Sequence, residues 1–152
     1  MFRGINGLNL DAKGRMVMPT RYRERFQKES KNVVVLTIDT EEKCLLVYPL
    51  PEWEEIESKL ALLPSFNPAA RRIQRLLIGH ATDVEMDGQG RILLPPLLRE
   101  YAGLDKHAVL VGQGKKFELW DEAHWNSRRQ EWLEEESNIG SALPEEVKSI
   151  SL

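Results

Sequence analysis

A short element containing aspartate, glycine and arginine occurs twice in this chain. It reads Asp11-Ala-Lys-Gly-Arg15-Met-Val-Met-Pro19 in the first copy and Asp87-Gly-Gln-Gly-Arg91-Ile-Leu-Leu-Pro95 in the second, at an offset of 76 residues (87 − 11). A planar guanidinium at the tip of a stiff turn can bind a phosphate group or the N7 and O6 atoms of guanine. It can equally form an ion pair with the aspartate four residues earlier. The residue types alone leave both roles open for Arg15 and Arg91.

The similarity between the copies extends beyond this element and indicates an internal duplication. Residues 8–26 and 84–102 share six identities, and the positions between them match in apolar character. A duplicated unit performs the same physical role twice, so its shared polar residues are the first candidates for function. The identical pairs are Asp11/Asp87, Gly14/Gly90, Arg15/Arg91, Pro19/Pro95, Arg23/Arg99 and Glu24/Glu100.

Turn geometry accounts for the aspartate and the glycine of each copy. Aspartate at the first position of a turn accepts hydrogen bonds from the backbone ahead of it, and the glycine can take the left-handed conformation. We therefore assign structural roles to Asp11, Asp87 and Gly90. A turn does not need the arginine that follows. Lys13 adds a second cation to the first copy, where the second copy has Gln89.

The sequence shows no arrangement typical of catalysis or metal binding. His80, His107 and His124 are scattered, and neither a His-Glu-x-x-His nor a Cys-x-x-Cys spacing occurs. No glycine-rich phosphate loop precedes a helix, and no serine lies in a nucleophile elbow. The glutamates cluster along helical faces, which favours a solvated surface. We expect no enzymatic activity, no cofactor and no metal; a hydrolase that uses these carboxylates is a remote alternative.

Size and composition are those of a globular chain. Its 152 residues, 41% of them apolar and 30% charged, suffice for one domain or for two intertwined halves. No run approaches the roughly 18 apolar residues of a membrane span, and the first seven residues lack the apolar core of a signal peptide. A single cysteine, Cys44, suits a reducing compartment and a place in the core. We expect a cytoplasmic protein without a membrane partner.

The charge is distributed unevenly along the chain. The net charge of −3 argues mildly against a nucleic-acid partner. However, residues 1–28 carry seven cations and two carboxylates, so this segment has a net charge of +5 and the rest has −8. The acidic residues gather mainly at residues 52–57 and 131–136. The basic segment includes Arg3 and Lys13 as well as Arg15.

The same order of elements is predicted in each half: a hairpin, a short helix, a second hairpin and a helix. In the first half, a strand containing Leu8 and Leu10 turns at residues 11–14 and returns at residues 15–18. Prolines end both returning strands, and the short helix after Pro95 stops at Gly103. Further strands are predicted at residues 33–38, 44–48, 108–111 and 117–120.

Helices close each half at residues 51–60 and 121–133, with Trp53 and Trp125 in matching places. Trp53 shares one apolar face of its helix with Ile56 and Leu60.

Between the halves, Asn67 caps a helix that we expect to end just before Gly79. Short hairpins alone bury too little apolar surface, so we expect the halves to share one barrel-like core with the helices outside. The expected organisation is a first repeat at 1–63, a linking helix at 64–79, a second repeat at 80–136 and a loose tail at 137–152.

These residues resemble the MraZ family, bacterial transcriptional regulators within the wider AbrB-like swapped-hairpin superfamily. The resemblance rests on both Asp-x-x-x-Arg elements, the Gly-Arg-apolar-apolar-apolar-Pro strands, the opening Phe2-Arg3-Gly4 and the helix between the copies, and it covers residues 1–143. It implies a mainly β fold with helices: a duplicated AbrB-like swapped-hairpin, or double-split, β-barrel. In such a barrel the two halves of one chain would do what two subunits do in AbrB-like dimers.

The resemblance also implies a function. It points to a ring-shaped homo-oligomer, associated with the nucleoid, that binds short G-rich direct repeats in double-stranded DNA. Such a repressor acts upstream of the division and cell-wall gene cluster, including its own gene. Basic edges aligned around a ring would let an acidic subunit bind DNA. The DNA-binding residues would be Arg15, Lys13, Gly14, Arg91 and Arg3, with Asp11, Asp87 and Gly90 shaping the turns.

An alternative function remains open at this point. The same fold could serve a protein that binds another protein instead of DNA, such as an antitoxin-like or scaffold ring. Duplex binding with a steep salt dependence would distinguish the repressor from this alternative.

Overall fold

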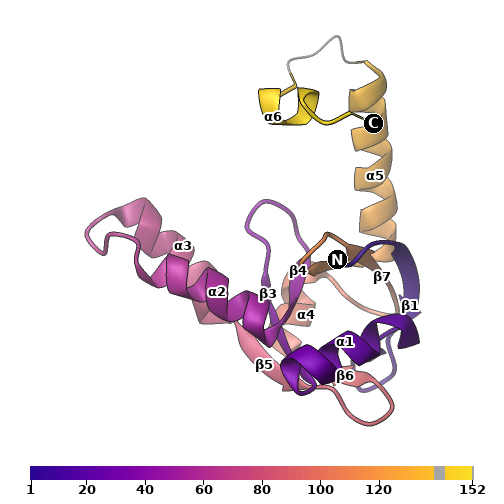
Figure 1. Ribbon diagram of the computed structural model, residues 1–152. Coiled ribbons are helices and arrows are strands. Elements are labelled where there is room, and N and C mark those ends of the chain that lie inside the picture. The colour runs from indigo at the N-terminus through magenta and orange to yellow at the C-terminus, as the bar shows by residue number, and fades with distance from the viewer. Residues whose placement is uncertain (139–142, 152) are drawn as a thin grey trace. The chain divides into compact units, whose positions relative to one another are not determined.

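The computed structural model describes residues 1–138 and 143–151 (Figure 1). The chain divides into two compact units, Met1–Glu122 and Ala123–Leu152. Both copies of the repeated element lie in the first unit, so the two copies share one compact body. This part of the chain contains every residue that we predict to contact DNA.

Six antiparallel strands form the main sheet of the first unit, and they exchange partners between the copies. The strands are β1 (Ile5–Asn9), β3 (Val33–Ile38), β4 (Leu45–Pro49), β5 (Thr82–Glu85), β7 (His107–Gly112) and β8 (Phe117–Asp121). Their order is β1-β7-β8-β4-β3-β5. The hairpins β3–β4 and β7–β8 meet through β4 and β8 at the centre, where Leu45 lies opposite Leu119. Each copy's first strand then pairs with the hairpin of the other copy.

A separate two-stranded ribbon joins β2 (Arg15–Val17) to β6 (Arg91–Leu93). Met16 lies opposite Ile92 at its centre, and both side chains are completely buried. The prediction that β1 and β2 pair as a hairpin is therefore wrong. The turn between them is tight, but β1 pairs with β7 over five residues while β2 pairs with β6. A three-residue strand makes few ladder bonds, and pairing with its counterpart places its central apolar residue in the shared core.

Two helices follow the ribbon strands: α1 (Thr20–Ser30) after β2 and α4 (Pro96–Ala102) after β6. The predicted end of α4 is confirmed, because Gly103 takes the left-handed conformation with φ 62°. We expected a short helix in the first half as well, but α1 has eleven residues. It ends at Ser30 and is followed by Lys31, which takes the left-handed conformation with φ 50°.

A second pair of helices, α2 (Leu50–Ala61) and α3 (Pro68–His80), packs together. The Asn67 cap is confirmed: its side chain accepts hydrogen bonds from the amides of Ala69 and Ala70 at 2.9 and 3.2 Å. The predicted end before Gly79 is wrong, since the helix includes Gly79 and continues to His80. The chain then runs directly into β5 through an extended Ala81, so no left-handed residue is needed.

The core of the first unit is built by both copies. Met16 and Ile92 belong to one cluster with Phe2, whose ring centroid lies 4.2 Å from that of Phe117. A second cluster forms under α2 around Trp53, with Ile56 and Leu60 packed against it as predicted. The expected core position of Cys44 is confirmed, and burial raises the pKa of its thiol well above the ordinary range.

Most of the second unit is the helix α5 (Glu122–Ser137), followed by the one-turn helix α6 (Glu145–Lys148). Within α5 the rings of Trp125 and Trp132 meet edge to face, with centroids 6.0 Å apart. The segment predicted to be a loose tail thus contains α6, while residues 139–142 and 152 lie outside the described residues. Among the helices of the described chain, none is long and apolar enough to cross a membrane.

The expected fold class is confirmed at the level of an antiparallel sheet combined with helices. The exchange of strands between the copies is the feature that a swapped arrangement requires. Closure into a double-split barrel stays a prediction.

Candidate nucleic-acid interface

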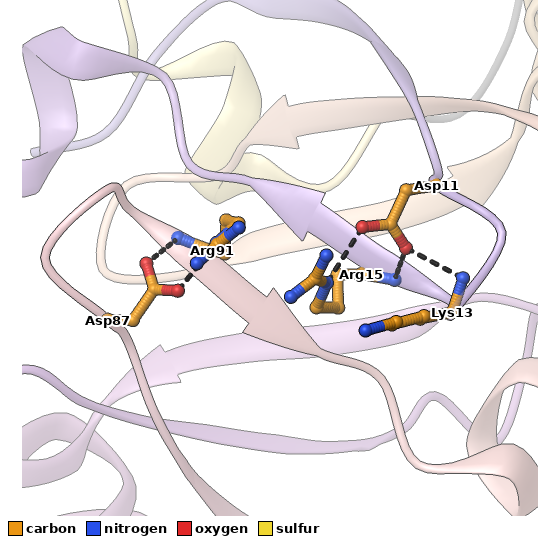
Figure 2. Close-up of polar contacts among 5 residues, drawn as sticks. All are labelled: Asp11, Lys13, Arg15, Asp87 and Arg91. Atoms are coloured by element: carbon orange, nitrogen blue, oxygen red, sulfur yellow. Dashed lines mark hydrogen bonds and ion pairs between the residues drawn. The ribbon is translucent and has the colours of Figure 1, made fainter.

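The first turn, residues 11–15, is held together by the carboxylate of Asp11 (Figure 2). One oxygen, Oδ1, accepts hydrogen bonds from the backbone amides of Lys13 and Arg15, both at 2.9 Å. The other, Oδ2, accepts a bond from Nε of Arg15 at 2.7 Å. Gly14 has φ 77° and donates its amide to the Asp11 carbonyl at 2.9 Å. A single side chain therefore fixes both the turn and the direction of its arginine.

The second turn, residues 87–91, repeats this geometry. Oδ1 of Asp87 accepts from the amides of Gln89 and Arg91 at 2.9 Å, and Oδ2 accepts from Nε of Arg91 at 2.6 Å. Gly90 has φ 78°. Equivalent hydrogen bonds in the two turns differ in length by no more than 0.1 Å. The third residue contributes only its backbone amide, so Lys13 and Gln89 fit equally well.

Hydrogen bonding keeps both aspartates ionised. Donation from the Arg15 backbone amide, followed by donation from its side chain, lowers the pKa of Asp11 below the ordinary value. Arg91 lowers the pKa of Asp87 through the same contacts. Each turn therefore carries a charged aspartate and a charged arginine at neutral pH.

Each aspartate engages only the Nε side of its guanidinium. In the part of the chain that the structure describes, the terminal nitrogens of Arg15 and Arg91 have no protein partner, and their side chains are 28% and 35% exposed. The two roles left open by the sequence are thus compatible. The ion pair orients the guanidinium, and its outer edge stays available for a ligand.

The ribbon brings the two arginines onto one surface. Arg15 lies opposite Leu93, and Val17 lies opposite Arg91, while the side chains between them point into the core. Val17 and Leu93 are 44% and 53% exposed. We call these four residues the outer ribbon face. A two-stranded ribbon has the width that the major groove of DNA admits, and its arginines and aliphatic groups match the edges of guanine and thymine.

The remaining predicted residues lie at different distances from this face. Lys13 and Gly14 belong to the first turn, directly before β2. Arg3 precedes β1, at the end of that strand remote from the turn, where its carbonyl accepts the hydroxyl of Tyr22. A five-residue strand separates Arg3 from the turn by roughly 16 Å. The structure therefore groups Lys13 and Gly14 with Arg15, but it does not bring Arg3 to them.

Sequence reasoning overlooked two features of this region. The sequence pattern identifies Val17 and Leu93 only as apolar strand positions, whereas the structure exposes both side chains. Arg23 and Arg99 are identical in the two copies, but the sequence alone predicts no role for them. In the structure each lies against a turn glycine, and the identity of the pair was the signal for it.

A separate cluster of Asp39, Cys44 and Glu118 has its side-chain ligand atoms within 4.8 Å of one another. Protein groups already engage it: Oδ2 of Asp39 accepts the amide of Glu42, and Glu118 accepts Nε1 of Trp120. Burial raises the pKa of Glu118 as well as that of Cys44. The Asp39 contact closes the β3–β4 turn, and the Glu118 contact lies within β8.

Comparison with known proteins agrees with the repeated element. The family model of MraZ proteins, which are described as antitoxin-like, matches residues 1–76 and again residues 77–142. The chain belongs to the MraZ family. Three relatives are named as the transcriptional regulator MraZ, and each aligns over 152 residues, the full length of both chains. The proteins from Coxiella burnetii, Legionella pneumophila and Halorhodospira halophila are 60%, 58% and 57% identical. The two family matches divide the chain between the copies of the element, as the internal duplication requires.

Proposed function

We propose that the protein is a transcriptional repressor that binds specific DNA sequences through its outer ribbon face. The observation that carries this proposal is the pair of arginines, each held by an aspartate at Nε and each without a partner at its outer edge among the described residues. The relatives' name as transcriptional regulators supports it, as does the absence of enzyme names among the relatives cited above. A preoriented guanidinium loses little freedom on binding, which favours recognition of a rigid acceptor pair such as guanine N7 and O6.

Each predicted residue has a distinct contact in this proposal. Arg15 and Arg91 bind guanine edges, while Val17 and Leu93 fill the apolar space between them. Lys13 neutralises a phosphate beside the first turn. Gly14 is buried beneath Arg99, so it takes part by closing the turn that directs Arg15. Arg3 binds a phosphate further along the duplex. In this proposal the ribbon recognises the DNA sequence, and Lys13 and Arg3 position the protein on the phosphate backbone.

One ribbon is too small for a tight complex. Specific DNA interfaces bury roughly 1,000–2,500 Å² of protein surface, far more than four side chains provide. We therefore propose that several subunits of a ring-shaped homo-oligomer engage short G-rich direct repeats together, because linked contacts gain affinity through effective concentration. The proposed targets lie upstream of the division and cell-wall gene cluster, including the protein's own gene. The protein would act in the cytoplasm at the nucleoid.

A titration of the purified full-length protein against the duplex upstream of its own gene tests this function. The parent should bind with a steep salt dependence, and duplexes with tandem repeats should bind far more tightly than a duplex with one. The double variant Arg15→Ala/Arg91→Ala should lose specific binding, whereas Arg71→Ala, which removes an exposed cation from α3, should retain it. A parent that fails to bind duplex DNA at low salt would contradict the proposal and favour the antitoxin-like, protein-binding alternative.

A further inference from the structure

Arg23 of α1 and Arg99 of α4 occupy equivalent positions in the two copies, and each lies against the turn glycine of the other copy. A Cβ atom placed on Gly14 would lie 2.6 Å from Cζ of Arg99, and one placed on Gly90 would lie 2.6 Å from Cζ of Arg23. Real Cβ atoms do not approach other heavy atoms so closely. Each guanidinium therefore occupies the space that a side chain at the turn would need.

The backbone reinforces this crossed arrangement. The Gly14 carbonyl accepts the amide of Leu94 at 3.1 Å, and the Gly90 carbonyl accepts the amide of Met18 at 2.8 Å. Both donors belong to the copy that also supplies the arginine. Each turn glycine is thus held by the opposite copy, at its carbonyl and at its α-carbon. We call these contacts the crossed clamp.

The two halves of the crossed clamp differ in one hydrogen bond. Nε of Arg23 donates to the carbonyl of Met18 at 2.8 Å, and the amide of Met18 donates to the carbonyl of Gly90. Met18 therefore links Arg23 to Gly90. Nε of Arg99 is buried and has no hydrogen-bond partner among the described residues. Arg99 also borders a cavity of about 340 Å³ with Asp11 and Lys106. Arg23 is therefore anchored, whereas Arg99 acts mainly by filling space.

We infer that Arg99 positions Arg15, and Arg23 positions Arg91, each across the boundary between the copies. Both clamp residues act through the turn glycine, which lies directly before the DNA-contacting arginine. The consequence for DNA binding rests on the proposed function; the crossed clamp itself does not. Each DNA-contacting turn needs contacts from the opposite copy, so the two copies together form one DNA-binding surface.

Hydrogen exchange of the turn amides tests the crossed clamp without DNA. Arg23→Ala should accelerate exchange at Gln89, Gly90 and Arg91 by about tenfold, as expected for the loss of one hydrogen bond with its packing. It should leave residues 13–15 unchanged. Arg99→Ala should do the reverse, with a smaller acceleration. Lys28→Ala on α1 is the matched control and should change neither turn. Acceleration in the turn of the same copy, or equal acceleration in both turns, would overturn the inference.

Binding cycles with duplex DNA distinguish positioning from direct contact. In the parent protein, Arg99→Ala should weaken DNA binding about tenfold. In a protein that already carries Arg15→Ala, it should weaken binding little further, whereas in one that carries Arg91→Ala it should again cost about tenfold. Arg99→Met restores the bulk without the charge, so it should bind within about twofold of the parent. The salt slope should stay unchanged. Equal losses for Arg99→Ala and Arg99→Met, with a reduced slope, would show instead that Arg99 contacts a phosphate. If the parent binds no DNA, the proposed function fails, and the exchange experiment still decides the crossed clamp.

Discussion

The two turns of the outer ribbon face have the same geometry but different charge. Their aspartate and arginine contacts agree within 0.1 Å, although the third residue is Lys13 in one turn and Gln89 in the other. In both turns the aspartate binds the backbone amide of this residue, which every residue type except proline provides. The exchange of Lys13 for Gln89 therefore leaves the folding of the turn unchanged and alters the charge that the turn offers to a ligand. The duplication preserved the device that orients an arginine and varied the charge beside it.

The largest expected effect comes from removing one oriented arginine. Arg15→Ala should weaken DNA binding by about 1–3 kcal/mol per engaged subunit, as for a lost guanine contact. Arg91→Ala should weaken it less, since no lysine accompanies Arg91. Competitive titration at fixed salt, with the thermal midpoint of unfolding checked for each variant, measures both. Parent-like affinity of Arg15→Ala would remove the first turn from the interface. An unfolded variant would show that Arg15 serves chiefly as the structural partner of Asp11.

Removing the orienting carboxylate should have an intermediate effect. Asp11→Asn keeps an acceptor for the backbone amides but loses the charge that holds Nε of Arg15. We expect binding to weaken about threefold to tenfold, because the guanidinium is still present but no longer held in one orientation. Asp87→Asn, measured in the same titration, is the matched variant in the second turn. An unchanged affinity for both would mean that the ion pairs do not orient the arginines for DNA.

Exchanging Lys13 and Gln89 between the two turns should alter mainly how strongly the DNA affinity depends on salt concentration. Lys13→Gln should reduce the slope of log affinity against log salt by about one, because one phosphate contact is lost. Gln89→Lys should not weaken binding, and it should steepen the slope by about one if the second turn faces the phosphates as the first does. Titrations at four or five salt concentrations give both slopes. A slope unaffected by Lys13→Gln would place the first turn away from the phosphates.

The smallest expected effect is the pH dependence of stability. Because folding lowers the pKa of Asp11 and Asp87 below the ordinary value of an aspartate, their contacts stabilise the protein at pH values above that ordinary pKa. This stabilisation is lost as the pH falls through the lowered pKa values of the folded state. The difference in thermal midpoint between the parent and Asp11→Asn/Asp87→Asn should therefore be constant from about pH 5 to 8 and shrink toward pH 3. A difference that grows on acidification has the wrong sign for these contacts.

The sequence predicted those parts of the site that depend on local chemistry. Asp11 and Gly14 specify a tight turn within five residues, and that turn forms as expected. The partner of β2 could not be predicted in this way, since an apolar three-residue strand pairs with whatever the global fold brings beside it. Gly79 suggested a helix end by residue type alone, yet the following strand continues directly from the helix. The local sequence thus specifies the turns, whereas the pairing of strands distant in the sequence determines where the turns lie in the fold.

Roles that act between the copies were likewise beyond sequence reasoning. Arg23 and Arg99 each lie eight residues after the arginine of their own copy, but each is inferred to position the arginine of the other copy. Nothing along the chain links Arg99 to Gly14. Their identity in the two copies marked them as important without showing for what. Which edge of Arg15 and Arg91 the aspartates hold also required the structure, because the sequence allowed the ion pair to engage either side of the guanidinium.

The most direct test of the ribbon contact changes the DNA instead of the protein. Replacing guanine by 7-deazaguanine in the repeats removes the N7 acceptor and leaves the Watson–Crick edge intact. The parent should bind the substituted duplex about tenfold more weakly, the effect of one lost hydrogen bond to a charged donor. The double variant Arg15→Ala/Arg91→Ala should bind both duplexes equally. If the parent binds the two duplexes equally, or if the double variant loses as much affinity as the parent, the arginines of the outer ribbon face do not read guanine.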